Sequence, residues 1–385
     1  MRSRFLGSSL FLVFSILLTA SIFIFSAPAI QAANYSWDPG TSGTWVWDTS
    51  TYYNWYDSTS SIDIRWPNLT DSVAVFGSGN LNGTITGGAV TVDSGGVQVN
   101  AITFDITGYS LSGGAITLAG STPTITVASG ATGTISANIA GSAGLIKTGG
   151  TLVLSGANAY SGITDIQSGY ITIGSDAALG ASGSGNGTVV ESGGGINNWL
   201  TRTVANEALT LNGSGDGTNM AMRVGGNQRL TWTGAVTLGS DTAILADGSA
   251  AYTFTKNIDG SAANSGSGAN FMVYLNAGAI SYFQGNVTLG SGTLTLTNTT
   301  TTTGSLTLTG TGNAWTGGTT ITGTLQIGDG GANGSLPDSG YITINASSTL
   351  IFNSSNSFTF SNATIIGDGG INANGTGTLT LSGTR

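Results

Sequence analysis

Five charged side chains in the middle of the chain are candidates for chemistry. They are the carboxylates of Asp216, Asp241 and Asp247 and the cations of Arg223 and Arg229. Paired carboxylates hydrolyse glycosidic bonds, and a carboxylate beside a basic group suits cleavage of an acidic polysaccharide. The alternative is that these charges lie on solvated loops of a less regular stretch, at 193–283. We expect the loops, and therefore predict no catalytic residue and no enzyme.

Two missing residue types restrict the chemistry further. The chain has no histidine and no cysteine. It therefore lacks the commonest general base, thiol nucleophiles, disulfides, and the imidazole and thiolate ligands that hold zinc. We predict no cofactor, and only oxygen atoms remain as ligands for a metal.

Calcium is the metal that oxygen ligands favour, and two aspartates are candidates. Asp329 and Asp368 occupy matching Ile-Gly-Asp-Gly-Gly motifs at 327–331 and 366–370. Carboxylates and carbonyls of such turns in adjacent layers could bind Ca²⁺. The alternative is that Asp and Gly form the turn itself. Because the regular Gly and Asp spacing of calcium-binding β-rolls is absent, we predict turns and no metal site.

The composition argues against nucleic acid as a partner. Only 7% of the 385 residues are charged, and the net charge is −9. Few basic groups are available to neutralise phosphates. Hydrophobic residues make up 39% of the chain and alternate with polar ones, so we expect a folded chain.

From residue 83 onward the chain is a series of short alternating strands separated by Gly, Asn, Asp and Ser. Examples are AVTV at 89–92, AITF at 101–104 and TITV at 124–127. Strict alternation places Val, Ile and Leu on one side and Thr on the other. We therefore predict an all-β region over 83–385.

Two segments about 154 residues apart are near-copies. GLIKTGGTLVLSGANAYSGITDIQSGYITIG spans 144–174, and GSLTLTGTGNAWTGGTTITGTLQIG spans 304–328. A unit that recurs with length changes in its turns is typical of stacked repeats. The matching aliphatic positions are predicted core residues, namely Leu152, Leu154, Ile166, Ile171, Ile173, Leu306, Leu308, Ile321, Leu325 and Ile327.

One copy is too small to fold alone. Strands at 151–154, 163–167 and 170–173 predict one triangular coil. Burying its few aliphatic side chains contributes far less free energy than ordering the residues of the copy costs. The coils must share their ladders and core, so we predict a parallel β-helix, or β-solenoid.

Residues 33–82 differ from the rest because they hold five of the eight tryptophans. Large rings bury roughly 150 to 250 Å² each and can close the open end of a sheet stack. We predict an aromatic-rich N-terminal cap. The alternative is a carbohydrate-binding platform, whose candidate glycan-binding residues are Trp45, Trp47, Tyr53 and Trp55.

Residues 1–32 show the successive basic, apolar and small-residue regions of a secretory signal peptide. Two arginines precede an apolar run at 10–25, and small residues follow. We predict cleavage after Ala29 or Ala32. An uncleaved anchor is the alternative, because the apolar segment is about long enough to span a bilayer. No second such stretch follows, so we expect no transmembrane segment after cleavage.

The repeat pattern restarts at 375–383 as a truncated third copy. An open sheet edge at this point would have to be covered. We therefore expect end-to-end self-association or a longer parent chain.

The segment 144–174 resembles the autotransporter-associated β-strand repeat of bacterial surface proteins. It matches the pattern GLxKTGxGTLxLSGxNxYxGxTxIxxGxLxIG at positions that include Lys147, Asn158 and Tyr160. The copy at 304–328 is weaker, with Trp315 at the tyrosine position. The resemblance implies a right-handed parallel β-helix passenger of a Gram-negative bacterium, exported through the inner membrane and then secreted or held at the cell surface.

We therefore predict a non-catalytic structural or adhesive surface protein. Its partners would be surface glycans or other cell-surface proteins, bound through weak contacts repeated over many coils. One alternative is a carbohydrate-binding module that uses the four aromatic residues above. The other is a polysaccharide lyase or hydrolase that uses the charged residues at 216–247.

Overall fold

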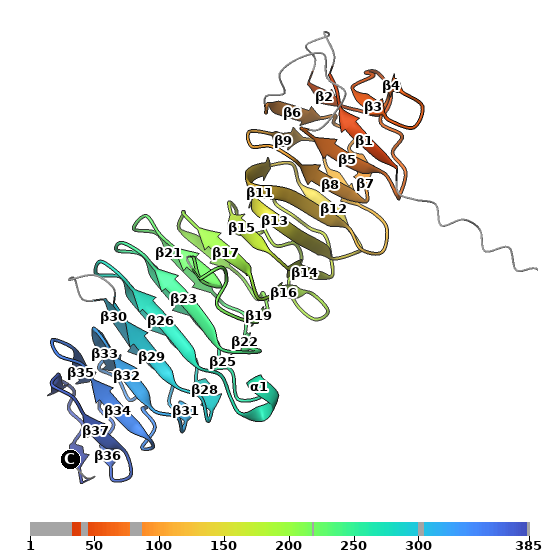
Figure 1. Cartoon of the computed structure of the whole chain (residues 1–385). Helices are drawn as coiled ribbons and strands as arrows, with labels where there is room; N and C mark the ends of the chain where they lie inside the picture. Colours follow the sequence, from red (N-terminus) through yellow and green to blue (C-terminus); the bar gives the residue numbers. More distant parts are fainter. Residues whose placement is uncertain (1–32, 40–44, 78–86, 218, 299–303, 383–385) are drawn as a thin grey trace, which may run out of the picture. The chain divides into compact units, whose positions relative to one another are not determined.

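The chain folds as an all-β parallel solenoid of about 12 turns, described by a computed structural model (Figure 1). The structure describes residues 33–39, 45–77, 87–217, 219–298 and 304–382. Within these ranges, helix is limited to the four-residue α1 (Ala263–Gly266). The prediction of an all-β chain wound as a parallel solenoid is therefore confirmed.

Strands from successive coils pair in parallel ladders on three faces. The first face contains β1 (Asn34–Trp37), β5 (Val73–Phe76), β8 (Ala101–Phe104), the first part of β11 (Thr124–Ile135), the first part of β13 (Leu145–Leu154), β14 (Ile163–Ile166), β16 (Gly187–Val190), β19 (Leu209–Leu211), β22 (Val236–Leu238), β25 (Ile258–Asp259), β28 (Val287–Gly290) and β31 (Ala314–Trp315).

The second face continues each coil after a bend. It contains β2 (Val46–Trp47), β6 (Ala89–Val92), β9 (Ser110–Gly113), the remainder of β11 and β13, β15 (Gly169–Ile173), β17 (Gly194–Asn198), β20 (Met222–Val224), β23 (Thr242–Ala246), β26 (Phe271–Leu275), β29 (Leu294–Thr297), β32 (Thr319–Ile321), β34 (Tyr341–Ile344) and β37 (Thr364–Ile366).

The third face is built from two separate ladders. The shorter ladder contains β7 (Val97–Val99), β10 (Ile116–Leu118) and β12 (Ile139–Gly141). The longer ladder contains β18 (Arg202–Val204), β21 (Arg229–Trp232), β24 (Ala251–Phe254), β27 (Ile280–Phe283), β30 (Ser305–Leu308), β33 (Thr324–Ile327), β35 (Thr349–Phe352) and β38 (Gly370–Ala373). A further pair joins β36 (Phe358–Phe360) to β39 (Leu379–Leu381).

Inward and outward side chains alternate along each strand and stack in register between coils. On the first face, Ile125 pairs with both Ile102 and Lys147. In β26 the odd-numbered residues are buried and the two between them face outward. All ten aliphatic residues that the repeats mark have 0% of their surface exposed. They belong to one hydrophobic core that runs through successive coils.

Bends between faces need glycine where neighbouring coils approach closely. Gly149 lies at the bend within β13 and has φ of +75°. A Cβ atom at this position would lie 1.9 Å from the carbonyl oxygen of Val127 in the adjacent coil. Both the positive φ and the close approach exclude a side chain there.

The repeat does not coincide with one coil, so the prediction of a three-stranded coil within it is wrong. Leu152 pairs directly with Ile171, which places these two segments in adjacent coils, and residues 155–162 between them contain no strand. In the second copy, Leu306 pairs with Leu325 in the same way, but on the third face. The pair in the first copy lies on the second face, whereas the equivalent pair in the second copy lies on the third. This shift is possible because all three faces accept the same alternating strand.

Coil length varies, which allows this shift. The backbone N–H of Gly149 donates to Ser168 Oγ in the next coil, 19 residues further along the chain. Asp259 accepts the Thr288 hydroxyl of the next coil, 29 residues further along. The longer coil accommodates α1 at one corner. Extra residues are therefore extruded at corners, as in other stacked repeats.

A buried asparagine joins three successive coils in each copy. Asn158 Oδ1 accepts the backbone N–H of Ile139 at 2.9 Å, and its Nδ2 donates to the carbonyl of Ala178 at 2.7 Å. Asn313 makes the equivalent bonds to the N–H of Val287 and the carbonyl of Ser335, each 2.8 Å long. The repeat therefore keeps this asparagine because it satisfies backbone groups that are buried at the corner.

The Tyr and Trp at equivalent repeat positions also share one role. The Tyr160 hydroxyl lies 2.7 Å from Thr164 Oγ1, and the Trp315 indole N–H donates to Thr319 Oγ1 at 3.0 Å. Both rings are buried. A phenol and an indole are therefore interchangeable here, because each fills the corner and reaches a threonine four residues on.

Lys147 points into the core with none of its surface exposed. Its ammonium group donates to the carbonyls of Thr148, Gly149, Gly150 and Ser168 at 2.8–3.2 Å. Burial lowers the pKa of Lys147 to about 8. This lysine of the repeat thus ties together backbone carbonyls of two adjacent coils at the bend.

Aromatic side chains fill the N-terminal end. β1 extends the first face and β2 the second, while β3 (Trp55–Asp57) and β4 (Ile62–Ile64) form an antiparallel hairpin against β1. The Trp55 ring centre lies 5.1 Å from those of Trp37 and Trp47, 4.6 Å from that of Trp66 and 5.4 Å from that of Phe76. We call these five residues the aromatic cluster.

Several expectations concern residues that the structure does not describe. They are the signal peptide at 1–32, residues 40–44 and 78–82 of the cap, and the final residue of the truncated copy at 375–383. In the part that is described, no helix combines the length and the apolar character needed to cross a bilayer.

Candidate functional site

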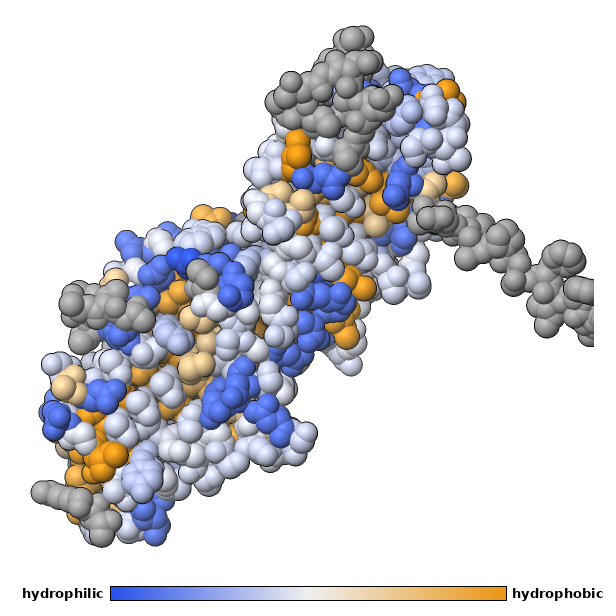
Figure 2. Space-filling model, viewed as in Figure 1, coloured by the Kyte–Doolittle hydropathy of each residue, from blue (hydrophilic) through white to orange (hydrophobic). Residues whose placement is uncertain are grey.

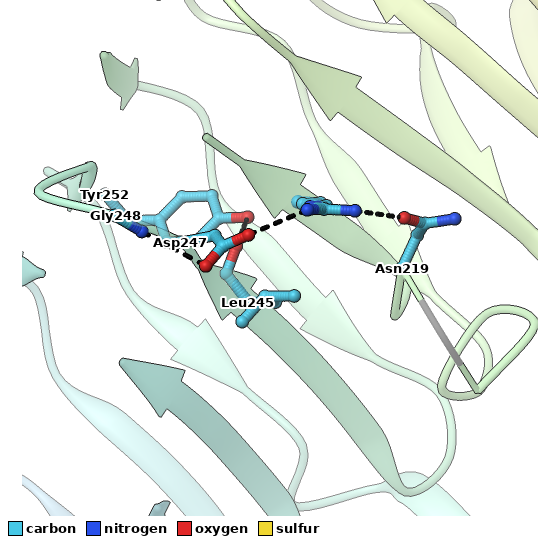
Figure 3. A network of polar contacts seen from close by, with 6 residues as sticks. Asn219, Leu245, Asp247, Gly248 and Tyr252 are labelled. Carbon is cyan, nitrogen blue, oxygen red and sulfur yellow. Dashed lines mark hydrogen bonds and ion pairs between the residues drawn. The ribbon is translucent and has the colours of Figure 1, made fainter. Parts of the chain in front are cut away.

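Three of the five charged residues, Asp216, Arg223 and Asp247, come together on the outer side of the second face. Figure 3 shows the contacts that join Asp247 and Asn219 in one network. Arg223 projects from β20, and its Nη2 lies 2.7 Å from Asp247 Oδ2. Its Nη1 donates to Asn219 Oδ1 at 2.6 Å. The backbone N–H of Asn219 in turn donates to Asp216 Oδ1 at 2.8 Å. The result is one polar network that spans two coils.

Asp241 and Arg229 do not meet this network. Asp241 accepts the backbone N–H of Asn270 at 2.9 Å and the side-chain Nδ2 of the same residue at 2.8 Å, so it holds the turn that precedes β26. Arg229 begins β21 on the third face and is exposed. The five charges therefore do not converge on one cleft, because strand register assigns them to different faces and corners.

Trp199, which no sequence motif marks, lies against this polar network. The guanidinium carbon of Arg223 lies 4.9 Å from the centre of its ring, a cation–π contact. Gly225 leaves room for the indole, since a Cβ atom there would lie 2.4 Å from the ring. Trp199 is 42% exposed and its neighbour Leu200 is 45% exposed. Together with Arg223, Asp247 and Asn219 they form what we call the Trp199 site.

The outward side-chain row through the Trp199 site changes character along the second face. The register partners in successive coils are Thr172, Asn197, Arg223, Leu245, Tyr274 and Thr297. Threonine stands at both ends, as the alternation predicts, but the middle of the row is aromatic, apolar and charged. The only sequence signal for this change is the interruption of the threonine pattern.

Buried polar atoms lie behind the exposed part of the Trp199 site. Asn197 is 7% exposed, and its Oδ1 has no hydrogen-bond partner among the described residues. The same holds for Nε of Arg223. The other side of Asp247 is held by the backbone N–H of Gly248, which donates to Oδ1 at 3.1 Å. Arg223 and Asp247 are thus fixed in position while some of their hydrogen-bonding capacity stays unused.

Of the two aspartates considered for calcium, Asp329 stabilises its own turn and Asp368 is exposed. Asp329 Oδ1 accepts the N–H of Gly331 at 3.2 Å and Nδ2 of Asn333 at 2.8 Å. Elsewhere, the N–H groups of Ala363 and Ser361 hold the pKa of Asp338 well below its usual range. No cluster of three or more acidic side chains that could hold a metal ion occurs among the described residues.

A buried carboxyl group lies away from the Trp199 site, between β18 and β19. Glu207 is 2% exposed, and its Oε1 accepts the Thr188 hydroxyl at 2.8 Å. It lines an open cavity of about 420 Å³ together with residues that include Asp176 and Leu179. Burial raises the pKa of Glu207 to about 7.

Glu207→Gln should remove a pH dependence of stability. The carboxyl group titrates near 4.5 when unfolded and near 7 when folded, so folding takes up a proton between these values. The wild-type chain must therefore lose stability as pH rises through this window, by at most about 3 kcal/mol. Denaturant unfolding at pH 4 to 8 measures this. Parallel pH profiles of the wild type and the variant would contradict the assignment.

The four candidate glycan-binding aromatics do not share one surface. Trp47 and Trp55 have 0% of their surface exposed. Trp45 is partly buried against the core, and Tyr53 is 55% exposed beneath Arg65, whose guanidinium carbon lies 4.5 Å from the ring centre. Glycan binding at these residues stays a prediction, and only Trp45 and Tyr53 present surface for it.

Comparisons with known proteins give one partial similarity. No family model matches the chain, and no solved structure matches it. The chain is 37% identical over 196 residues to the adhesin BmaC autotransporter of Brucella suis biovar 1 (strain 1330). The matched region is 49% of this chain and 5% of that adhesin, so the chain spans only a small part of its relative's length.

Proposed function

We propose that this chain is an adhesive segment of an autotransporter-type passenger, secreted or displayed at the surface of a Gram-negative bacterium. One observation carries the proposal: the chain is a parallel β-solenoid and shares 37% identity over 196 residues with an autotransporter adhesin. This observation agrees with the resemblance of 144–174 to the autotransporter-associated repeat.

The surface chemistry supports adhesion through many weak contacts. Figure 2 shows a face that is largely of intermediate hydropathy, with hydrophilic and hydrophobic residues in small groups. Charged residues make up only 7% of the chain, so long-range attraction contributes little. Outward Thr and Ser repeat from coil to coil, which gives a target several equivalent contact points. Partners would be surface glycans or other cell-surface proteins.

The proposal includes no catalytic step. Asp241 is engaged in a turn, and Arg223 is paired with Asp247. The arrangement favours binding over bond cleavage, since paired acids with a free approach to one glycosidic bond are what hydrolysis needs.

Display of residues 33–385 on a non-adherent bacterium should raise attachment to cultured epithelial cells several-fold over the display scaffold alone. Attached bacteria are counted after washing, with surface expression matched by antibody labelling. Equal attachment of scaffold and displayed chain, on epithelial cells and on other cell types, would contradict the proposed function.

A further inference from the structure

We propose that the Trp199 site binds a neutral saccharide through the exposed indole of Trp199 and the Arg223–Asp247 pair. This inference rests on the proposed adhesive function and names a ligand class for one site. Nothing in the repeat pattern requires these residue types at outward positions, where threonine is the rule.

An exposed indole is the first element of the site. All eight tryptophans lie in the described ranges, and Trp199 is the most exposed of them. The others fill the N-terminal end or the core. Leu200 continues the apolar surface beside it. A sugar ring presents C–H groups on one face, so it can cover such an apolar patch while its hydroxyl groups remain at the rim.

A fixed donor and acceptor pair is the second element. Arg223 contacts Trp199, Asn219 and Asp247 at once, which holds its planar group in one orientation. Asp247 is held from the other side by Gly248, yet its side chain is 38% exposed. A carboxylate oxygen accepts more than one hydrogen bond and a guanidinium has five N–H donors. Adjacent hydroxyl groups of a sugar could donate to the first and accept from the second.

Charge balance selects a neutral ligand over an anionic one. The Arg223 cation is already neutralised by Asp247 at 2.7 Å, and Asp216 is linked to the same network through Asn219. The site therefore carries a net negative charge, in a chain whose own net charge is −9. A uronate or sulfate group would be repelled, whereas neutral hydroxyl groups keep both members of the pair satisfied.

The site is also preorganised, which lowers the entropic cost of binding. Trp199 and Leu200 follow β17, Arg223 stands on β20 and Asp247 follows β23. These three strands are paired in register. Gly225 leaves room for the edge of the indole, so Trp199 is positioned by packing and not by the ligand.

Binding can be read from Trp199 itself. The full chain is tested on an array of neutral, uronate-containing and sulfated oligosaccharides, and the neutral ligands that bind are titrated by tryptophan fluorescence with acrylamide quenching. We expect binding to neutral oligosaccharides only, with Trp199 protected from quenching. Trp199→Ala and Asp247→Asn should each weaken binding about tenfold or more, whereas Trp199→Phe should retain part of it.

Tyr341→Ala is the matched control, because Tyr341 is 62% exposed on β34 in another coil. It should leave binding unchanged. Binding to anionic glycans alone, no binding to any glycan, or neutral binding that persists unchanged in Trp199→Ala and Asp247→Asn would each overturn the inference. The same variants are also displayed on the non-adherent bacterium and tested in the attachment assay. Attachment that is present but insensitive to Trp199→Ala rejects this site alone, whereas absent attachment rejects the adhesive function.

Discussion

Trp55→Ala is expected to unfold the N-terminal end of the solenoid locally, at a cost of about 3–5 kcal/mol. Trp55 has 0% of its surface exposed and contacts every other member of the aromatic cluster. Truncation of Trp55 to alanine leaves a cavity that small movements of the surrounding rings cannot fill. Because each coil is stabilised by its neighbours, the loss should be greatest in the coils next to β1 and β5.

Hydrogen exchange by mass spectrometry measures this local effect. Peptides from 33–77 should lose protection in Trp55→Ala, while peptides beyond β23 should keep it. Tyr53→Ala is the control, since its exposed ring should contribute no more than about 0.5 kcal/mol. A variant that keeps its protection but loses glycan binding would mean that the aromatic residues form a carbohydrate platform and not a cap.

Asn158→Leu should destabilise the chain by about 2–5 kcal/mol, with the largest loss of protection in the three coils that Asn158 joins. Leucine has the same branched arrangement of side-chain heavy atoms but leaves the N–H of Ile139 and the carbonyl of Ala178 buried without a partner. Each such group costs about 1–3 kcal/mol. Chemical denaturation, combined with hydrogen exchange, measures the loss.

Asn313→Leu provides the matched test in the second copy, where the bonds are equivalent. We expect a loss of similar size there, and near-additive losses in the double variant because the sites share no partner. A leucine variant as stable as the wild type at either position would show that the asparagine bridges are dispensable.

The alternation of side chains was enough to predict the core. Leu152 and Ile171 were assigned to the interior from their spacing alone, and both have 0% of their surface exposed. The reason is local: a strand has a period of two, so one pattern determines which side chains face inward. The corner glycines and the turn-forming Asp329 could be recognised from residue type, because Gly adopts a positive φ and Asp hydrogen-bonds its own backbone turn.

The position of each strand within a coil could not be predicted. The repeat appeared to be one coil, yet Leu152 and Ile171 pair between coils, and the second copy lies on another face. Three faces accept the same alternating strand, so local pattern does not distinguish them. Corner lengths, summed over many coils, decide which face a strand joins.

The Trp199 site shows the same limit. Arg223 and Asp247 were grouped by proximity in the sequence, but so were Asp241 and Arg229, which the fold places elsewhere. Trp199 lies 24 residues before Arg223 and meets it only because β17 and β20 are neighbours in register.

The fold class, the buried aliphatic residues and the likeness to a surface repeat could be predicted from the amino-acid pattern, since each is expressed within a short segment. Which outward side chains meet became visible only in the folded chain, because contacts between coils depend on register and on corner lengths that no local pattern encodes.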